Sequence, residues 1–264
     1  MTYMHYHAPP PLTSTLSDMH SNITQHLKDQ ANLRSNYNAA TQHEFLTAAG
    51  TLTLSPARLA LWLCQDRIYA AHAYPRFIGL LISKIPFDGP AIEEELNRET
   101  LALLTMCLEG IIREVSFFEG VAKEWSLDIN GWKERKATRD YTAEMARVAS
   151  VGSLEEGLVF LWAMEQVYLD AWKYVKSLFP PQSDSEDYTA NAIRQFTNNW
   201  TTPEFEEFVQ KLEALTNRHF ARRHHGHSRS AVRAMESIWE RVVELEEKFW
   251  PEEGEDTCLS SKTF

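Results

Sequence analysis

The segment from residue 158 to residue 172 constrains the fold more than any other part of the chain. Its sequence, LVFLWAMEQVYLDAW, is largely apolar and aromatic, and it carries Glu165 near its middle. At helical spacing one face carries four of its larger side chains, Leu161, Glu165, Tyr168 and Trp172. Burying an unpaired carboxylate is costly and usually shifts its pKa. This face therefore predicts a polar pocket inside a helical protein, unless Glu165 lies at the edge of the buried stripe, facing solvent or a basic side chain.

Composition restricts the class of protein. The 264 residues include 8 Trp, 9 Tyr and 13 Phe, which favours a thick core or an aromatic cavity. A formal net charge of -11 argues against nucleic-acid binding, which needs a basic surface. No apolar run reaches the roughly 20 residues that span a bilayer, and the N-terminus lacks the features of a signal peptide. We therefore expect a cytoplasmic protein without nucleic-acid or membrane partners.

Cysteine and histidine usage predicts neither a metal site nor a cofactor. None of the three cysteines belongs to a CxxC pair; Cys64 and Cys107 are expected to be buried, and Cys258 exposed. Three histidines lie in the basic segment 222–229, where a metal site is conceivable because imidazole is a common ligand. Neighbouring Gly and Arg residues, and the absence of nearby carboxylates, favour a flexible surface loop.

Helical periodicity without strand alternation predicts an all-α protein with a single domain. We expect a disordered leader at 1–12, a helical domain at 13–250 and an acidic, disordered tail at 251–264. Ser55 with Pro56, and Ser153 with Glu156, have the spacing of helix N-termini. The predicted helices cover about 13–34, 40–48, 56–82, 90–125, 138–149, 154–172, 188–199, 203–217 and 231–250.

Several other side chains are candidates for a site, each with a structural alternative. Asp66 and Tyr69 share a helix face and suit a ligand amine, although Asp66 could equally pair with Arg67 or with another helix. Tyr141, near a helix start, is more often simple packing. Glu246 lies in an acid-rich final helix, which is usually a solvated face.

These residues stand in an order that resembles the TenA (thiaminase-II-like) family. The resemblance spans about residues 41–250. The motifs that carry it are Gly50-Thr-Leu followed by Gln65-Asp66 and Tyr69, then Tyr141-Thr142 with Met145, Val151-Gly-Ser-Leu-Glu-Glu156, Pro203-Glu-Phe205, and Glu246 with Phe249-Trp250. Each motif is weak alone, whereas their shared order and spacing are fairly specific.

The resemblance implies a heme-oxygenase-like, multi-helical fold and a pocket for an aminopyrimidine. Asp66 would hold the pyrimidine amino group and ring nitrogen, with Tyr69, Tyr141 and Tyr168 lining the pocket. Glu246 would lie at its deep end as proton donor or acceptor. Relatives assemble as dimers or tetramers, so a homodimer or homotetramer is expected.

Two departures from the family pattern change the expected chemistry. The position of the family's nucleophilic cysteine is occupied by Met164, so covalent catalysis by cysteine is not expected. The chain is similar instead to a branch with a glutamate on this helix, here Glu165. Trp200 replaces a tyrosine of the cysteine type. The glutamate branch is associated with salvage of thiamine breakdown products.

The resulting hypothesis is a C–N hydrolase that acts on an amino- or formylamino-pyrimidine. Glu165 would be the general base, Glu246 would protonate the departing nitrogen, and Asp66 would anchor the ring. Unlike environments should separate the pKa values of the two glutamates. The alternatives are a non-catalytic, ligand-binding or regulatory protein on the same scaffold and, with less support from the motifs, an oxidase-type relative.

Overall fold

The structure is a computed structural model that describes residues 22–86, 91–181, 187–223 and 229–260. Its α-helices are α2 (Ile23–Lys28), α3 (Arg34–Thr41), α4 (Glu44–Gly50), α5 (Pro56–Ile68), α6 (Tyr74–Ser83), α7 (Ala91–Glu124), α8 (Lys136–Val151), α9 (Leu154–Ser177), α10 (Tyr188–Trp200), α11 (Pro203–Arg223), α12 (Arg229–Phe249) and α13 (Glu255–Cys258). A 3₁₀ turn, η1 (Ala31–Leu33), precedes α3, and a π-helical turn, η2 (Tyr69–Ala73), joins α5 to α6. These ranges contain no β-strand, and the all-α prediction is confirmed.

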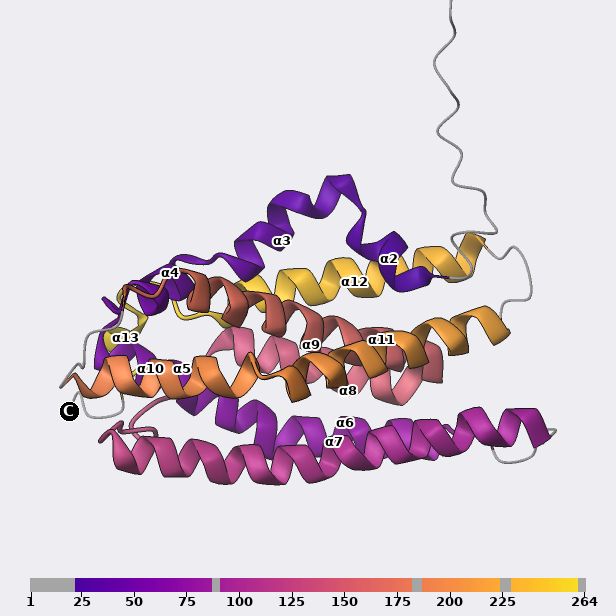
Figure 1. The fold of residues 1–264 in the computed structure, drawn as a ribbon, viewed down its shortest axis with the longest axis horizontal. Helices are drawn as coiled ribbons and strands as arrows, with labels where there is room; N and C mark the ends of the chain where they lie inside the picture. The colour runs from indigo at the N-terminus through magenta and orange to yellow at the C-terminus, as the bar shows by residue number, and fades with distance from the viewer. Residues whose placement is uncertain (1–21, 87–90, 182–186, 224–228, 261–264) are drawn as a thin grey trace, which may run out of the picture.

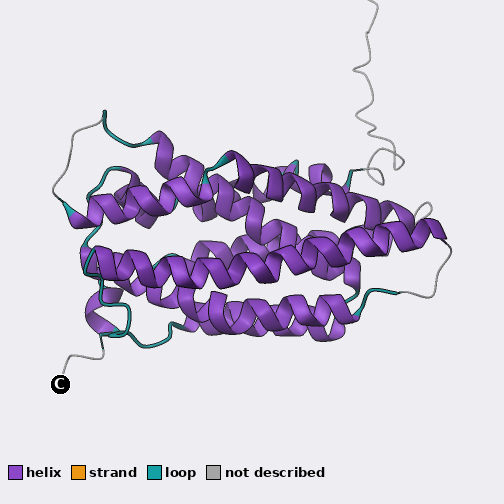
Figure 2. Ribbon diagram, turned by 60° about the horizontal axis from the view of Figure 1, so that its bottom comes forward, coloured by secondary structure: helices purple, strands orange, loops and turns teal. Residues whose placement is uncertain are grey.

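Helix α9 is the centre of the fold. It contacts α3, α4, α6, α8, α10, α11 and α12. The long helices run along the longest axis of the molecule, with α3 on one edge and α7 on the opposite edge (Figure 1), and the loops lie at their two ends (Figure 2). An apolar helix needs such cover on all sides. No helix of the described ranges is long and apolar enough to cross a membrane.

The predicted helix starts of α5 and α9 are confirmed. The Ser153 hydroxyl accepts a hydrogen bond from the Glu156 amide, and the Glu156 carboxylate accepts one from the Ser153 amide, which completes a capping box. Ser55 caps α5 through the Arg58 amide, and Pro56 occupies the first turn. These local bonds set where the two site-bearing helices begin.

Two predicted N-terminal helices differ from the structure. The helix expected over 40–48 is divided between α3 and α4, because His43 adopts an extended backbone and its Nδ1 accepts a hydrogen bond from the Phe45 amide. In the helix expected over 13–34, residues 13–21 lie outside the described ranges, and α2 ends at Lys28. The chain turns there through η1, which buries Leu33.

Residues 251–260 differ from the disordered tail that we expected. They include α13, and Glu255 forms a 2.5 Å ion pair with Arg135. Arg135 is buried and also donates hydrogen bonds to the carbonyl oxygens of Phe249 (2.5 Å) and Trp250 (3.3 Å). One buried guanidinium therefore holds both the end of α12 and the segment that follows it, an interaction that acidic composition alone does not reveal.

Candidate active site

A cavity of about 530 Å³ lies among the helices around α9. Its lining comes from α5, η2, α6, α7, α8, α9, α10, α11 and α12. Its apolar walls include four phenylalanines, Phe117, Phe205, Phe208 and Phe249. This volume is within the usual range for a small-molecule site.

All seven residues that the sequence analysis selected line this one cavity. They are Asp66, Tyr69, Tyr141, Glu165, Tyr168, Trp200 and Glu246. On α9 only part of the predicted face reaches the cavity, because Leu161 and Trp172 are fully buried outside its lining. Glu165 therefore lies in a pocket and not at a solvated edge.

The π-helical turn η2 places two tyrosines on the cavity wall. The Tyr74 amide donates to the Tyr69 carbonyl, which is the hydrogen bond of a π turn, with donor and acceptor five positions apart. The two rings lie 6.0 Å apart, edge to face. In a regular α-helix, positions five apart point roughly 140° away from each other. The wide turn reduces this divergence, and so Tyr74, which sequence reasoning missed, also lines the cavity.

Three of the cavity carboxyls each accept a hydrogen bond from a phenol. Tyr74 donates to Glu165 Oε1 at 2.9 Å. Tyr141 donates to Glu246 Oε1 at 2.5 Å, and Tyr168 donates to Asp66 Oδ2 at 3.0 Å. These bonds fix the orientation of the carboxyls without supplying a positive charge.

Burial raises the pKa values of these carboxyls. Burial, followed by the charge of Glu114, raises the pKa of Glu165 to about 8, against the lowering effect of the Tyr74 hydrogen bond. Burial likewise raises the pKa of Glu246 to about 8, although the hydrogen bond from Tyr141 lowers it. The two pKa values are similar, not separated as we expected, because both groups are buried with one phenol each. Both carboxyls can therefore exchange protons near neutral pH.

Asp66 does not pair with its sequence neighbour. Arg67 lies 3.9 Å from Glu119 instead. Asp66 is only 5% exposed, and burial followed by the charge of Glu114 raises its pKa well above the usual range. Of the two readings left open by the sequence, the structure supports a carboxyl that faces the cavity.

Glu114 on α7 is a further acidic residue of the cavity, and the sequence analysis missed it. Its Oε1 accepts a 2.7 Å hydrogen bond from the Trp200 indole N–H, and burial raises its pKa to about 7. The signal was present in the chain. Glu114 follows Ile111 by three residues and precedes Phe118 by four, so it interrupts the apolar face of a helix just as Glu165 does.

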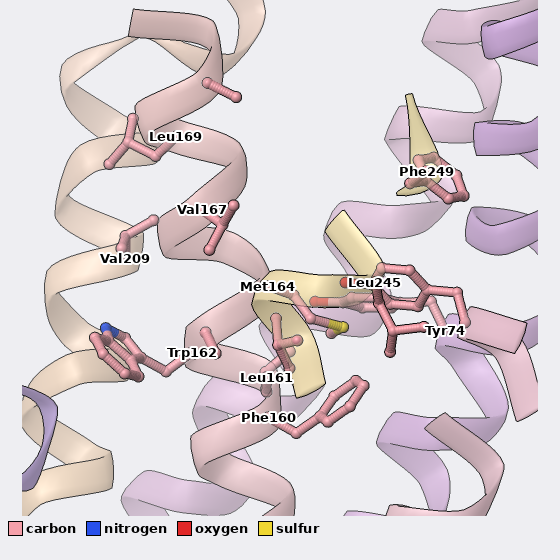
Figure 3. Close-up of a cluster of buried hydrophobic side chains, with 14 of the residues drawn as sticks. Tyr74, Phe160, Leu161, Trp162, Met164, Val167, Leu169, Val209, Leu245 and Phe249 are labelled. Atoms are coloured by element: carbon pink, nitrogen blue, oxygen red, sulfur yellow. The ribbon is translucent and has the colours of Figure 1, made fainter. Parts of the chain in front are cut away.

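Met164, which we expected at the position of the family's nucleophilic cysteine, also lines the cavity. Figure 3 shows its side chain extending from α9 toward Tyr74 and Leu245, whereas Trp162 points to the other side of the helix. Its sulfur accepts a 3.4 Å hydrogen bond from the Tyr69 hydroxyl.

Cys107, buried as predicted, also lines the cavity, and burial raises the pKa of its thiol to about 12. That thiol is therefore a poor nucleophile at neutral pH.

The part of the chain described by the structure contains no group of three side chains suited to holding a metal ion. The histidines of segment 222–229 lie outside the described residues, at positions 224–228. The other cysteine predictions are confirmed, since Cys64 is buried and Cys258 is exposed.

Residues 30–256 match the model of the TENA/THI-4/PQQC family. The chain belongs to this family. The match covers most of the chain and includes every residue of the cavity named above, so the family prediction from the motifs is confirmed. The membership agrees with the all-α architecture.

Individual solved structures share the fold of this chain at low sequence identity. A TenA homologue from Pyrococcus furiosus superposes with a TM-score of 0.69 at 24% identity, covering 86% of this chain and 97% of that one. A TenA family transcription regulator from Silicibacter sp. TM1040 gives a TM-score of 0.71 at 16% identity, covering 89% and 97%. These likenesses concern the fold.

A curated protein of Fusarium pseudograminearum (strain CS3096), described as a "Probable transcription factor", is 26% identical over 278 residues. The alignment covers 92% of this chain and 54% of that protein. The chain thus spans about half the length of this curated relative.

Proposed function

We propose that the protein is a C–N hydrolase of amino- or formylamino-pyrimidines, of the glutamate type within its family. The observation that carries the proposal is a pair of glutamates in one small cavity, Glu246 buried and Glu165 partly buried, each held by a phenol and each with its pKa raised to about 8. Acid–base catalysis at neutral pH needs carboxyls with pKa values in this range.

In the proposed reaction, water attacks the methylene carbon that carries the substituent nitrogen. Glu165 takes a proton from the water as the new C–O bond forms. Glu246 gives its proton to the nitrogen as the C–N bond breaks, so that an aminomethyl substrate yields a hydroxymethyl product and ammonia. One carboxyl gains a proton and the other loses one, and the pair returns to its starting state by exchange with solvent.

The similar pKa values of the two glutamates still permit different roles. The charge of Glu246 raises the pKa of Glu165, so loss of one proton from the pair opposes loss of the second. A singly ionised pair is therefore favoured around pH 8, and it contains one base and one acid. We propose that the bound substrate selects which carboxyl of the pair holds the proton.

Asp66 and the tyrosines are proposed to position the ring. The Asp66 carboxyl, oriented by Tyr168, would accept hydrogen bonds from the pyrimidine amino group, or donate one to a ring nitrogen when protonated. Tyr69 and Tyr141 lie 5.4 Å apart, edge to face, and present flat aromatic surface and hydroxyl groups. Trp200 also lines the cavity and would contribute aromatic surface to it.

Replacing Glu165 with Gln tests the assignment. The amide can still accept the hydrogen bond from Tyr74 but cannot remove a proton from water. We expect turnover of the preferred pyrimidine to fall by roughly 10²–10⁴-fold, measured by chromatography of the product. Asp170→Asn is the matched control, since Asp170 is on the same helix but outside the cavity lining, and it should keep near-parental activity. Parental turnover by Glu165→Gln would refute the proposed base.

A second candidate function is a ligand-binding regulatory protein that uses the same cavity without catalysis. It is favoured by the descriptions of two relatives, a "Probable transcription factor" and a TenA family transcription regulator. Calorimetric titration with aminopyrimidines separates the two functions. Tight binding without any turnover would support the regulatory protein.

A further inference from the structure

Glu114 differs from the other cavity carboxyls in its partner and its position. It comes from α7, at the edge of the molecule away from α3 (Figure 1), and its partner is an indole N–H instead of a phenol. Its charge is the largest electrostatic influence on both Asp66 and Glu165, which places it close to the two carboxyls assigned to the substrate ring and to water activation.

The partner of Glu114 is rigidly packed. The Trp200 ring stacks on the buried Phe196 at 5.6 Å and meets the partly buried Tyr168 edge to face at 5.1 Å. The hydrogen bond from this ring uses Glu114 Oε1, and Oε2 has no hydrogen-bond partner among the residues that the structure describes. A fixed carboxyl with a free oxygen in a cavity is preorganised to bind a donor group.

The cavity has a strong charge imbalance. Five carboxyls line it: Asp66, Glu114, Glu165 and Glu246, and also Glu204, which is exposed. The one cation in the lining is Arg113, whose side chain is exposed and forms no ion pair with any described residue. Buried carboxylates need compensation by positive charge or by protons. A cationic ligand supplies that compensation, whereas a neutral ligand does not.

We propose that Glu114, held by the Trp200 indole, is a specificity-determining residue that binds the cationic ammonium group of an aminomethyl-pyrimidine and selects it over neutral pyrimidines. This inference rests on the proposed function and narrows its substrate class. A substrate that enters as an ammonium ion already carries the proton that Glu246 supplies to a neutral amine. The nitrogen then departs as ammonia when the C–N bond breaks, and Glu165 takes the proton of water. A formylamino group has no such charge and would gain nothing from Glu114.

The test compares binding of a cation and a neutral analogue. An aminomethyl-pyrimidine and the corresponding hydroxymethyl-pyrimidine are titrated calorimetrically at pH 7.5 into Glu165→Gln protein, in which turnover is suppressed, and into the Glu114→Gln/Glu165→Gln double variant. We expect the second substitution to weaken binding of the amine by about 10- to 100-fold and of the alcohol by less than about 3-fold. Glu109→Gln, an exposed position of α7 outside the cavity, is the control and should change neither affinity.

The outcomes are distinguishable. Equal weakening of both ligands, or no weakening of the amine, overturns the role of Glu114 while leaving the proposed function in place. Failure of the Glu165→Gln protein to bind either pyrimidine overturns both. If the double variant does not fold, Trp200→Phe serves instead, because it removes the N–H donor and keeps Glu114. Losing the donor should raise the pKa of Glu114 and weaken amine binding more at pH 7 than at pH 8.5; a loss that is independent of pH would contradict the proposal.

Discussion

Replacing Glu165 with Gln should stabilise the folded protein, and the gain should grow with pH. In the unfolded chain this glutamate ionises around its usual value of 4.5, whereas in the folded protein it keeps its proton to about pH 8. As the pH rises through this window, the unfolded state loses a proton that the folded state retains. The free energy of unfolding therefore decreases with rising pH. Glutamine does not titrate, so the variant escapes this loss.

The size of the effect follows from the two pKa values. At pH 7 the unfolded glutamate is about 2.5 pH units above its pKa, and the folded one is still mostly protonated. With 1.36 kcal/mol per unit, the parent is destabilised by about 3 kcal/mol at pH 7 and by less than about 1 kcal/mol at pH 5. Any fixed cost of burying the amide applies at both pH values, so the difference between pH 5 and pH 7 isolates the ionisation.

Urea unfolding of parent and variant at pH 5 and pH 7 measures this difference directly. Glu109→Gln on the exposed face of α7 controls for the removal of a glutamate from the surface. If the stability difference between Glu165→Gln and the parent were the same at both pH values, the folded carboxyl would have an ordinary pKa. The argument for a catalytic proton at this position would then fail. A variant that is more stable and less active would show that the site is maintained at a cost in stability.

Two further predictions concern the pH profile and the end of α12. If Glu165 is the base and Glu246 the acid, kcat/KM measured from pH 6 to pH 10 should give a narrow bell centred near pH 8, because both pKa values are about 8; a plateau from pH 5 to pH 9 would exclude this pair. Arg135→Ala should lower the free energy of unfolding by roughly 3–5 kcal/mol, because it leaves buried carbonyl oxygens and Glu255 without their donor. Arg139→Ala, at an exposed position one turn along α8, should cost far less in the same urea titration.

Local signals account for the elements that were predicted well. The starts of α5 and α9 depend on hydrogen bonds between residues three apart, and such bonds are encoded in Ser55 and in the Ser153–Glu156 pair. The core helix was identifiable because, in an all-helical protein, a helix that is apolar on nearly all sides must be buried at the centre. The break at His43 was missed because histidine can be helical or extended, and its identity alone does not show that it caps α4.

The site residues also divide into those that local sequence signals identified and those that the sequence did not reveal. Asp66, Glu165 and Glu246 were identified through motif order, and their position on helix faces follows from periodicity. Tyr74 was not predicted, because its direction depends on a π-helical turn that α-helical spacing does not anticipate. Glu114 was overlooked because it belongs to none of the family motifs and is one of several glutamates along its helix.

By itself, the sequence determined that the chain is helical, which helix is central, and which family it belongs to, because helix caps, apolar periodicity and motif order are local properties of the chain. The tertiary structure alone decided which carboxyls share a cavity, which phenol or indole holds each of them, and that no buried cation balances them among the described residues. Those properties depend on distances between helices far apart in sequence. The pKa values that underlie the proposed chemistry depend on burial and neighbouring charge, and these exist only once the helices have packed.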